Sequence, residues 1–430
     1  MRQPQTRQPS RRPSRLWWWL AMALPAPALA GPLADALDLA LQRDPEWQLA
    51  QAQVAGQQAA SRLQRAALLP QLSWDAAKTR QQEPQSATTQ QHQWTLSQVL
   101  FDLAQWKNWR SQQLRGDAQA VLQDAARQAL LQQLAERYFD VLAAQDALAV
   151  AQTTEQAFAD LVKDLRIKVD QGLMAPLDLD LATSFESSAR SITLQQQQWL
   201  EQARTQWRFW QPASQAALPG LAPSHRFADP QGGPEHWWQL AQQSPRLRAQ
   251  QLLLEAAQAD VDAARAGHLP TLQARWSQGS QKDLSGSTQP QRSVGVSLSL
   301  PLDAGGAVRA RTEQALGALQ AQQARGEQER RAVEAEVRLQ RGAWEAAVAR
   351  TRFTQEGALA AQRAVEATRT GQALGTRTLN DLLAAIQSQG QARLTDSQAR
   401  QQAVLASLRL KAAAGQLTRE DILLVDQSLQ

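Results

Sequence analysis

The charged residues best placed to do chemistry lie in two short glycine-containing stretches about 200 residues apart. The stretches run from Gly172 to Asp178 and from Gly375 to Asp381, so each places an aspartate six positions after a glycine. The second stretch also contains Arg377. A carboxylate repeated around a narrow pore concentrates cations and repels anions, whereas charges of this kind on an ordinary surface are solvated helix caps. The spacing alone leaves both interpretations open.

The sequence lacks several common motifs for enzymatic catalysis. The chain contains no cysteine, no G-x-S-x-G nucleophile motif, no P-loop and no H-E-x-x-H motif. The four histidines are scattered without metal-ligand spacing: they are His92, His225, His236 and His268. We therefore expect a protein that is not an enzyme, with no catalytic residue, no metal and no cofactor. Any energy the protein uses would come from partner proteins.

A basic and then apolar N-terminal segment predicts a cleaved signal peptide over residues 1–30. Five arginines precede an apolar core from Leu16 to Leu24, and Ala28 to Ala30 form an A-x-A site before Gly31. The apolar core is too short for a membrane helix, which needs ~20 residues. We therefore expect export rather than a retained anchor. The missing cysteine predicts a mature protein without disulfides or an N-terminal lipid.

Removal of this segment changes the charge balance. The full chain has 45 basic and 40 acidic side chains, a net charge of +5. Five arginines and no acids leave with the signal peptide, so the mature chain has 40 of each and a net charge of zero. A basic surface for nucleic acid therefore has no support, and we expect no nucleic-acid partner.

Long helices must position the two glycine-containing stretches. Residues 104–170 and 307–370 lack proline and are rich in strong helix formers. Shorter helices are expected after each turn, over 176–210 and 378–414. Each glycine turn would therefore join a long helix and a shorter helix into a hairpin.

Two further helices are expected before the strands described below. Pro45 predicts a break near Asp44 in a helix over 33–69, and the second helix covers 236–268. In the first long helix, apolar residues three, four or seven apart predict a narrow seam for one partner helix rather than a wide globular core. These residues are Leu130, Leu134, Tyr138, Val141 and Leu148.

Four segments alternate between apolar and polar residues at the period of a β-strand. They cover residues 71–78, 93–101, 271–278 and 293–302, with polar loops expected over 79–91 and 282–291. Membrane strands and half-buried antiparallel sheets share this alternation. Tryptophans cluster around the strands as in an interfacial aromatic belt: they are Trp74, Trp94, Trp106, Trp109 and Trp276.

A membrane segment in the mature chain would have to be a strand, because no apolar run of 18 residues follows Ala30. Four strands cannot close a barrel, since spanning barrels begin at about eight strands. Two or three copies would therefore have to share one barrel.

The chain contains two copies of one unit, offset by about 200 residues. The first structural repeat covers 31–234 and ends in a proline-rich connector over 211–234; the second covers 235–430. Three pairs of residues match between the repeats: Pro45 with Pro245, Pro70 with Pro270, and Asp102 with Asp303. The common order is helix, strand, strand, long helix, shorter helix.

Four features carry a family resemblance: this duplicated plan, the GTRT-x2-D element from Gly375 to Asp381, the turn from Gly172 to Asp178, and the segment Ala413 to Leu423. Together they resemble the TolC family of outer-membrane efflux proteins. The resemblance covers residues 31–430. It implies a mainly α fold with a membrane β-barrel: a homotrimer in which each protomer gives four strands to a twelve-stranded barrel. Duplicated helical hairpins would form a tunnel across the periplasm, and the connector with the C-terminal segment would form a belt around it.

The resemblance also implies a function and partners. The protein would be a passive duct in the outer membrane, in contact with outer-membrane lipid, that completes a tripartite efflux pump or a type I secretion system. A periplasmic adaptor would open it, and an inner-membrane pump or ABC transporter would act through that adaptor. The adaptor would dock on the hairpin tips, at Gly172, Leu173, Met174, Gly375 and Thr376.

The family's gate maps onto the two aspartates and the arginine. An Arg–Asp link that holds the entrance closed maps onto Arg377 and Asp178, and an aspartate ring at the constriction maps onto Asp381. A second aspartate ring is replaced by Ala384, and a gate tyrosine by Gln372. These departures predict an entrance that is less acidic and held by fewer bonds.

One alternative remains from the sequence, a soluble periplasmic coiled-coil adaptor or scaffold with a small sheet domain. The transported substrate is open as well, because the pump and the adaptor choose the cargo.

Overall fold

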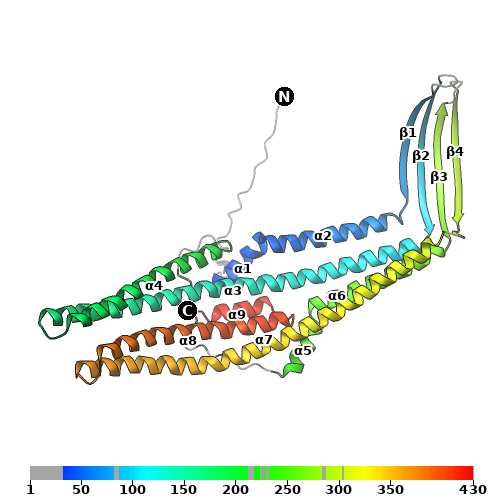
Figure 1. Ribbon diagram of the computed structural model, residues 1–430. Helices are drawn as coiled ribbons and strands as arrows, with labels where there is room; N and C mark the ends of the chain where they lie inside the picture. Colours follow the sequence, from blue (N-terminus) through cyan, green and yellow to red (C-terminus); the bar gives the residue numbers. More distant parts are fainter. Residues whose placement is uncertain are drawn as a thin grey trace, which may run out of the picture.

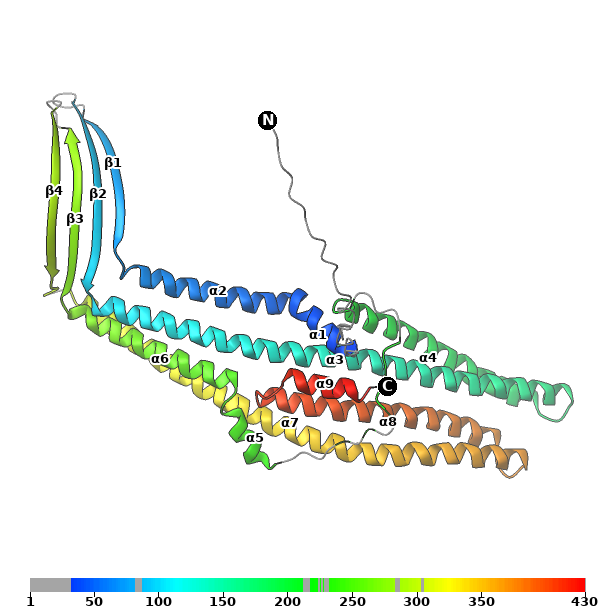
Figure 2. The ribbon, with the colours of Figure 1, turned by 180° about the vertical axis from the view of Figure 1, so that it is seen from behind.

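The computed structural model describes residues 32–81, 87–211, 217–222, 225, 227, 232–282, 287–302 and 305–429. The expected signal peptide and Asp303 lie outside these residues. The molecule is elongated, with long helices side by side and a four-stranded sheet at one end (Figure 1). Figure 2 shows the same arrangement from behind. The two turns that each join a long helix to a shorter one lie at the end remote from the sheet.

Two helical hairpins make up most of the length. Helix α3 (Leu103–Asp170) is followed by α4 (Pro176–Arg208), and α7 (Ala307–Ala373) by α8 (Leu379–Ala413). The prediction of two long and two shorter helices is therefore confirmed. Gly371 lies in the last turn of α7, so the expected end of that helix near residue 370 is wrong by one turn.

Each of the two helices that precede the strands is interrupted at a proline. Helices α1 (Pro32–Arg43) and α2 (Pro45–Ala66) meet at Asp44, whose carboxylate accepts a hydrogen bond from the Trp47 amide at 2.8 Å, as the predicted break requires. The expected continuous helix over 236–268 is wrong. Helix α5 (Pro234–Ala241) ends before Pro245 begins α6 (Pro245–Arg265), and a 3-10 turn follows over Ala266–His268. Proline cannot continue a helix but fits its first turn.

The four strands form one antiparallel sheet in the order β1-β2-β3-β4. They are β1 (Gln71–Gln81), β2 (Ala87–Phe101), β3 (Thr271–Lys282) and β4 (Thr288–Ser299). Most described residues of the expected polar loops are therefore strand. Those residues lack the apolar alternation on which strand prediction depends. The expected extension of the fourth strand to residue 302 is wrong, because β4 ends two residues before Pro301, which has no N–H for a ladder.

The largest apolar core lies midway along the bundle. It packs α3 against α1, α8 and the C-terminal helix α9 (Arg419–Gln427), and it includes Leu134 and Tyr138, both fully buried. The Tyr138 hydroxyl donates to the Pro219 carbonyl at 2.7 Å, which anchors the connector on α3. The expected narrow seam is therefore wrong: several elements cover this part of α3. The connector also meets the C-terminal segment at the Leu221–Leu429 bridge.

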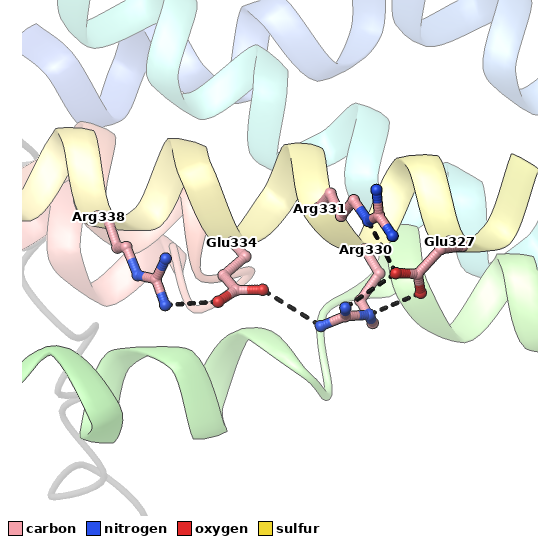
Figure 3. Close-up of polar contacts among 5 residues, drawn as sticks. All are labelled: Glu327, Arg330, Arg331, Glu334 and Arg338. Atoms are coloured by element: carbon pink, nitrogen blue, oxygen red, sulfur yellow. Dashed lines mark hydrogen bonds and ion pairs between the residues drawn. The ribbon is translucent and has the colours of Figure 1, made fainter.

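Helix α7 carries a ladder of ion pairs on its surface (Figure 3). Glu327 pairs with Arg330 and Arg331, and Glu334 pairs with Arg330 and Arg338, all at three- or four-residue spacing. Hydrogen bonds from Arg330 and Arg331 lower the pKa of Glu327 from 4.5 to about 2. Pairs at this spacing lie on one face of a helix and favour the helical conformation. Among the described residues, no helix combines the length and apolar character needed to cross a membrane.

Candidate functional site

The first hairpin tip is a glycine turn between α3 and α4. Gly172 adopts φ +71°, a left-handed conformation that favours glycine. The Leu173 amide donates to the Lys168 carbonyl at 2.8 Å, and the Gly172 amide donates to the Val169 carbonyl at 2.9 Å. This Schellman arrangement satisfies the last carbonyls of α3 and reverses the chain.

The second tip repeats this geometry between α7 and α8. Gly375 adopts φ +74°, and the Thr376 amide donates to the Gly371 carbonyl at 2.8 Å. Thr378 then caps α8. Its amide donates to the Asp381 carboxylate at 2.9 Å, and the Asp381 amide donates to the Thr378 hydroxyl at 3.2 Å. These hydrogen bonds from Thr378, and to a lesser extent the nearby Arg377 guanidinium, lower the pKa of Asp381.

Asp178 and Asp381 occupy the same position in their helices, the third residue of α4 and of α8. The residue that caps α4 is Ala175, which has no hydroxyl, and no side chain caps that helix. The carboxylate of Asp178 therefore lacks the capping partner that Asp381 has. Within one protomer, Arg377 and Asp178 form no ion pair with each other or with another described residue.

Gly371 makes room for the side chain of Arg377. A Cβ atom at Gly371 would lie 2.7 Å from the Cγ atom of Arg377, closer than real Cβ contacts allow. The absence of a side chain at Gly371 thus lets the aliphatic part of the Arg377 side chain lie over the last turn of α7. This role of Gly371 could not be predicted from the sequence, because no local pattern shows which residue crosses a helical glycine.

An apolar cluster beneath the tips holds the two hairpins together. Leu165 and Ala182 of the first hairpin pack there with Leu382, Leu383 and Ile386 of α8, among others. On the opposite side of α8, Asp381 and Ala384 are exposed and lie one helical turn apart. Packing of this cluster therefore fixes the orientation of α8, so that Asp381 lies on its exposed face.

The ends of the hairpins are exposed. Of the five expected docking residues, Gly172, Leu173, Gly375 and Thr376 are exposed, while Met174 is half-buried against the apolar cluster. Leu177 and Leu374 stand beside them with 75% of their surface exposed, and sequence reasoning missed both. Large apolar residues next to a turn glycine were the available signal.

The sheet has two chemically different faces. Directly paired residues share a face, so the register places Leu72, Leu96, Trp276 and Val294 in one row across all four strands. The alternate positions form the other face, which is almost entirely glutamine, serine, threonine and glycine. After a bulge between Val99 and Phe101, it is Phe101 rather than Leu100 that pairs with Leu272 and continues this face.

The described residues contain no group of three or more histidine, cysteine, aspartate or glutamate side chains that could hold a metal ion. His92, the histidine in β2, stacks on Trp74 with the ring centroids 6.1 Å apart.

Comparisons with known proteins agree over most of the chain. Residues 36–208 and 238–416 match the family described as Outer membrane efflux protein. The chain is 29% identical to alkaline protease secretion protein AprF of Pseudomonas aeruginosa, covering 96% of this chain and 91% of the relative. It is 26% identical to outer membrane protein TolC of Vibrio cholerae, covering 93% and 94%.

Solved structures share the fold. The CmeC outer membrane channel of Campylobacter jejuni has a TM-score of 0.80 at 16% identity, covering 93% of this chain and 90% of that one. The open MtrE outer membrane channel of Neisseria gonorrhoeae has a TM-score of 0.75 at 21% identity, with 90% of each chain covered.

Proposed function

Because the chain belongs to the outer membrane efflux protein family, we propose that it is the passive outer-membrane channel of an efflux or type I secretion system. The sheet lies in the outer membrane, and the helical hairpins extend into the periplasm. The observation that carries this function is the sheet itself, whose apolar face is exposed and whose other face is polar. In a membrane barrel such faces contact lipid and lumen, respectively.

A homotrimer completes the channel. Both edge strands, β1 and β4, lack a second neighbour among the described residues. Free edges expose unpaired backbone groups, and the hydrocarbon core tolerates strands only in a closed barrel. Three copies supply twelve strands, above the minimum of about eight. The duplicated units, 31–234 and 235–430, supply one hairpin each to the helical tunnel, so three copies give six hairpins around it.

The cargo class is open between small molecules and secreted proteins. One relative is named for secretion of alkaline protease, and proteases secretion protein PrtF of Dickeya chrysanthemi is 26% identical, covering 91% of this chain and 89% of the relative. Other relatives carry the name TolC. A periplasmic adaptor and an inner-membrane transporter would select the cargo.

Recordings in planar bilayers test the proposed function. Purified protein in its membrane oligomer should give discrete, long-lived conductance steps, because its polar sheet face encloses an aqueous path. Fractionation should place the protein in the outer membrane. A soluble periplasmic protein without a membrane oligomer, or a folded oligomer that never conducts, would refute the proposal and favour the adaptor alternative.

The gate at the hairpin tips is proposed as a link between protomers. Asp178 lacks the capping partner of Asp381, and Arg377 has no described ion-pair partner within its own chain. An Arg377–Asp178 pair between neighbouring protomers satisfies both, and three symmetric copies hold the entrance closed. Asp381 lines the constriction as one carboxylate per protomer. The adaptor docks on Gly172, Leu173, Met174, Gly375 and Thr376 and shifts the gate toward its open state.

Removal of either partner should open the gate. We expect Asp178→Ala and Arg377→Ala each to raise the mean conductance, because either substitution removes all three symmetric copies of the link, each contributing ~0–1 kcal/mol. Asp180→Ala and Arg369→Ala, which remove exposed charges nearby on α4 and α7, are the controls. Single-channel recording provides the measurement. Equal conductance in the gate variants and the controls would refute the link.

A further inference from the structure

The apolar face of the sheet changes character along the strands. Near the helices it carries leucine and valine, for example Leu272, Leu298 and Val296. Farther along it carries tryptophan, namely Trp74, Trp94 and Trp276. Beyond the tryptophans this face becomes basic at Lys78, Arg80 and Lys282, and a fourth basic residue, Arg292, lies on the same face in the row of Trp74 and Trp94. We call these four residues the basic girdle.

The strand register establishes how the girdle lies relative to the tryptophans. Trp74 pairs with Trp94, Trp94 with Gln278, and Gln278 with Arg292, so Arg292 shares a row with two tryptophans. Lys78 and Lys282 both pair with Gln90, four residues beyond Trp94 along β2. At ~3.3 Å per residue this row lies ~13 Å beyond the tryptophans. The girdle therefore begins in the row of Trp74 and Trp94 and extends beyond it toward the distal ends of the strands.

Charge on this face has one sign. The only acidic residue in the described strands is Asp75, and it lies on the opposite face, as does the only other basic strand residue, Arg275. All four girdle side chains are exposed, and none forms an ion pair with a described residue. Four unpaired cations on one side of a sheet create a positive potential that an anionic partner would neutralise.

We propose that the basic girdle binds phosphate groups of anionic lipids in the outer leaflet of the membrane. The inference rests on the proposed function, which places this face against lipid with its distal end outward. Tryptophan gathers at the boundary between hydrocarbon and headgroups, so side chains just beyond it lie at headgroup depth. Lysine and arginine at that depth attract anionic headgroups, and arginine binds phosphate oxygens in a bidentate manner. A glycolipid with two phosphates could bridge Lys78 and Lys282, which share a row.

The test compares lipid retention by the membrane oligomer. Wild-type protein and the variant K78Q/R80Q/K282Q/R292Q are reconstituted in phosphatidylcholine vesicles with or without diphosphoryl lipid A, then repurified. Bound lipid is counted by native mass spectrometry. Arg275→Gln is the matched control, since it neutralises a β3 cation on the opposite face. Because each basic residue near an anionic surface contributes roughly a fivefold factor, retention should fall more than ~tenfold in the girdle variant and stay unchanged in the control.

Two further measurements make the result decisive. Retention by the wild type should fall as salt is raised, because screening weakens contacts between exposed charges. Inorganic phosphate at matched phosphate concentration should displace little lipid, since it lacks the acyl chains that hold the ligand at the sheet. Equal retention by wild type and girdle variant, an equal loss in Arg275→Gln, or full displacement by phosphate would overturn the proposal.

Channel recordings separate this inference from the proposed function. The girdle variant should conduct like the wild type, because none of its changes faces the lumen. Normal conductance with unchanged lipid retention would overturn the headgroup site alone. Absence of conductance from the folded wild-type oligomer would instead overturn the channel on which the inference rests.

Discussion

Asp178 and Asp381 show how one missing hydroxyl separates two equivalent residues. Both are the third residue of a helix that follows a glycine turn, but only Asp381 has a threonine to form a capping box. A carboxylate held by a capping hydrogen bond is constrained toward its own helix. An equivalent carboxylate without one can accept a partner from another chain. This difference supports the proposal, taken first from the family resemblance, that Asp178 forms the intersubunit link and Asp381 supplies the charge at the constriction.

The lowered pKa of Asp381 has a defined consequence for pH. A carboxyl group with a folded pKa below its ordinary value of 3.8 stabilises the fold above that value and loses this contribution as pH falls through the folded pKa. Asp381 should therefore stay ionised through mildly acidic pH. Cation selectivity that depends on it should persist to about pH 4 and decline below.

Two variants separate the charge of Asp381 from its capping role. Asp381→Asn should lower cation preference at neutral pH. Thr378→Ala should keep the preference, cost ~1 kcal/mol of stability through the lost cap, and move the decline in selectivity to higher pH. Reversal potentials in a salt gradient measure the preference, with Asp180→Asn as the control. Equal cation preference in Asp381→Asn and wild type would rule out a filter at this position.

Gly371 offers a second prediction at the scale of a single residue. Gly371→Ala places a methyl group 2.7 Å from the Cγ atom of Arg377, so the arginine must move. We expect a leakier channel, although alanine in a helix is otherwise better than glycine by ~0.5–1 kcal/mol. Gly357→Ala in the same helix has no atom within 4 Å of the new Cβ and should leave conductance unchanged. Identical single-channel records for both variants would contradict the proposed role.

At the scale of elements, α3 and α8 approach each other closely at Gly390, beside a poorly filled region. A Cβ atom at Gly390 would lie 2.7 Å from the Thr154 hydroxyl, and next to this contact is a cavity of about 370 Å³ lined by Phe158 and Phe185, among others. Farther toward the sheet, the Gln401 amide donates to the Asp146 carboxylate at 2.8 Å. The close approach at Gly390 therefore lies between an apolar cluster on the tip side and a polar bridge on the sheet side.

This close approach predicts a coupling between two residues. Gly390→Ala should destabilise the protein by ~1–3 kcal/mol through overpacking, and adding Thr154→Ala should recover most of the loss. Thermal unfolding of the oligomer, followed by circular dichroism, measures both. Gly326→Ala, with no atom within 4 Å of its Cβ, is the control. Simple additivity of the two substitutions would show that the loss of stability does not arise from the contact between residue 390 and Thr154.

At the scale of the whole molecule, the sheet must separate lipid from lumen. Val296 and Ser297 are neighbours in β4 but lie on opposite faces. Val296→Arg should weaken membrane folding by ~2–4 kcal/mol if its depth is near the bilayer midplane, while Ser297→Arg should be tolerated and alter conductance. The heat-modifiable oligomer on gels and its urea midpoint measure the difference. Greater tolerance at Val296 than at Ser297 would reverse the assignment of the faces.

The sequence by itself determined the helices, the glycine turns and the alternation of the inner parts of the strands. Helix propensity, left-handed glycines and a two-residue period depend on neighbours in the chain, so residues such as Gly172, Gly375 and Trp276 could be interpreted without coordinates. The duplicated plan and the family resemblance followed from the same local signals. The distal strand ends escaped prediction, because polar residues on both faces carry no apolar period.

Only the tertiary structure decided how residues distant in sequence meet. It placed the stem of Arg377 over Gly371, paired Asp381 rather than Asp178 with a cap, and widened the expected seam at Tyr138 into a core shared by several elements. It also aligned Arg292 of β4 with Trp74 of β1 through two intervening strands. These relations depend on packing and on strand register, which are properties of the folded chain as a whole and leave no mark in any single segment.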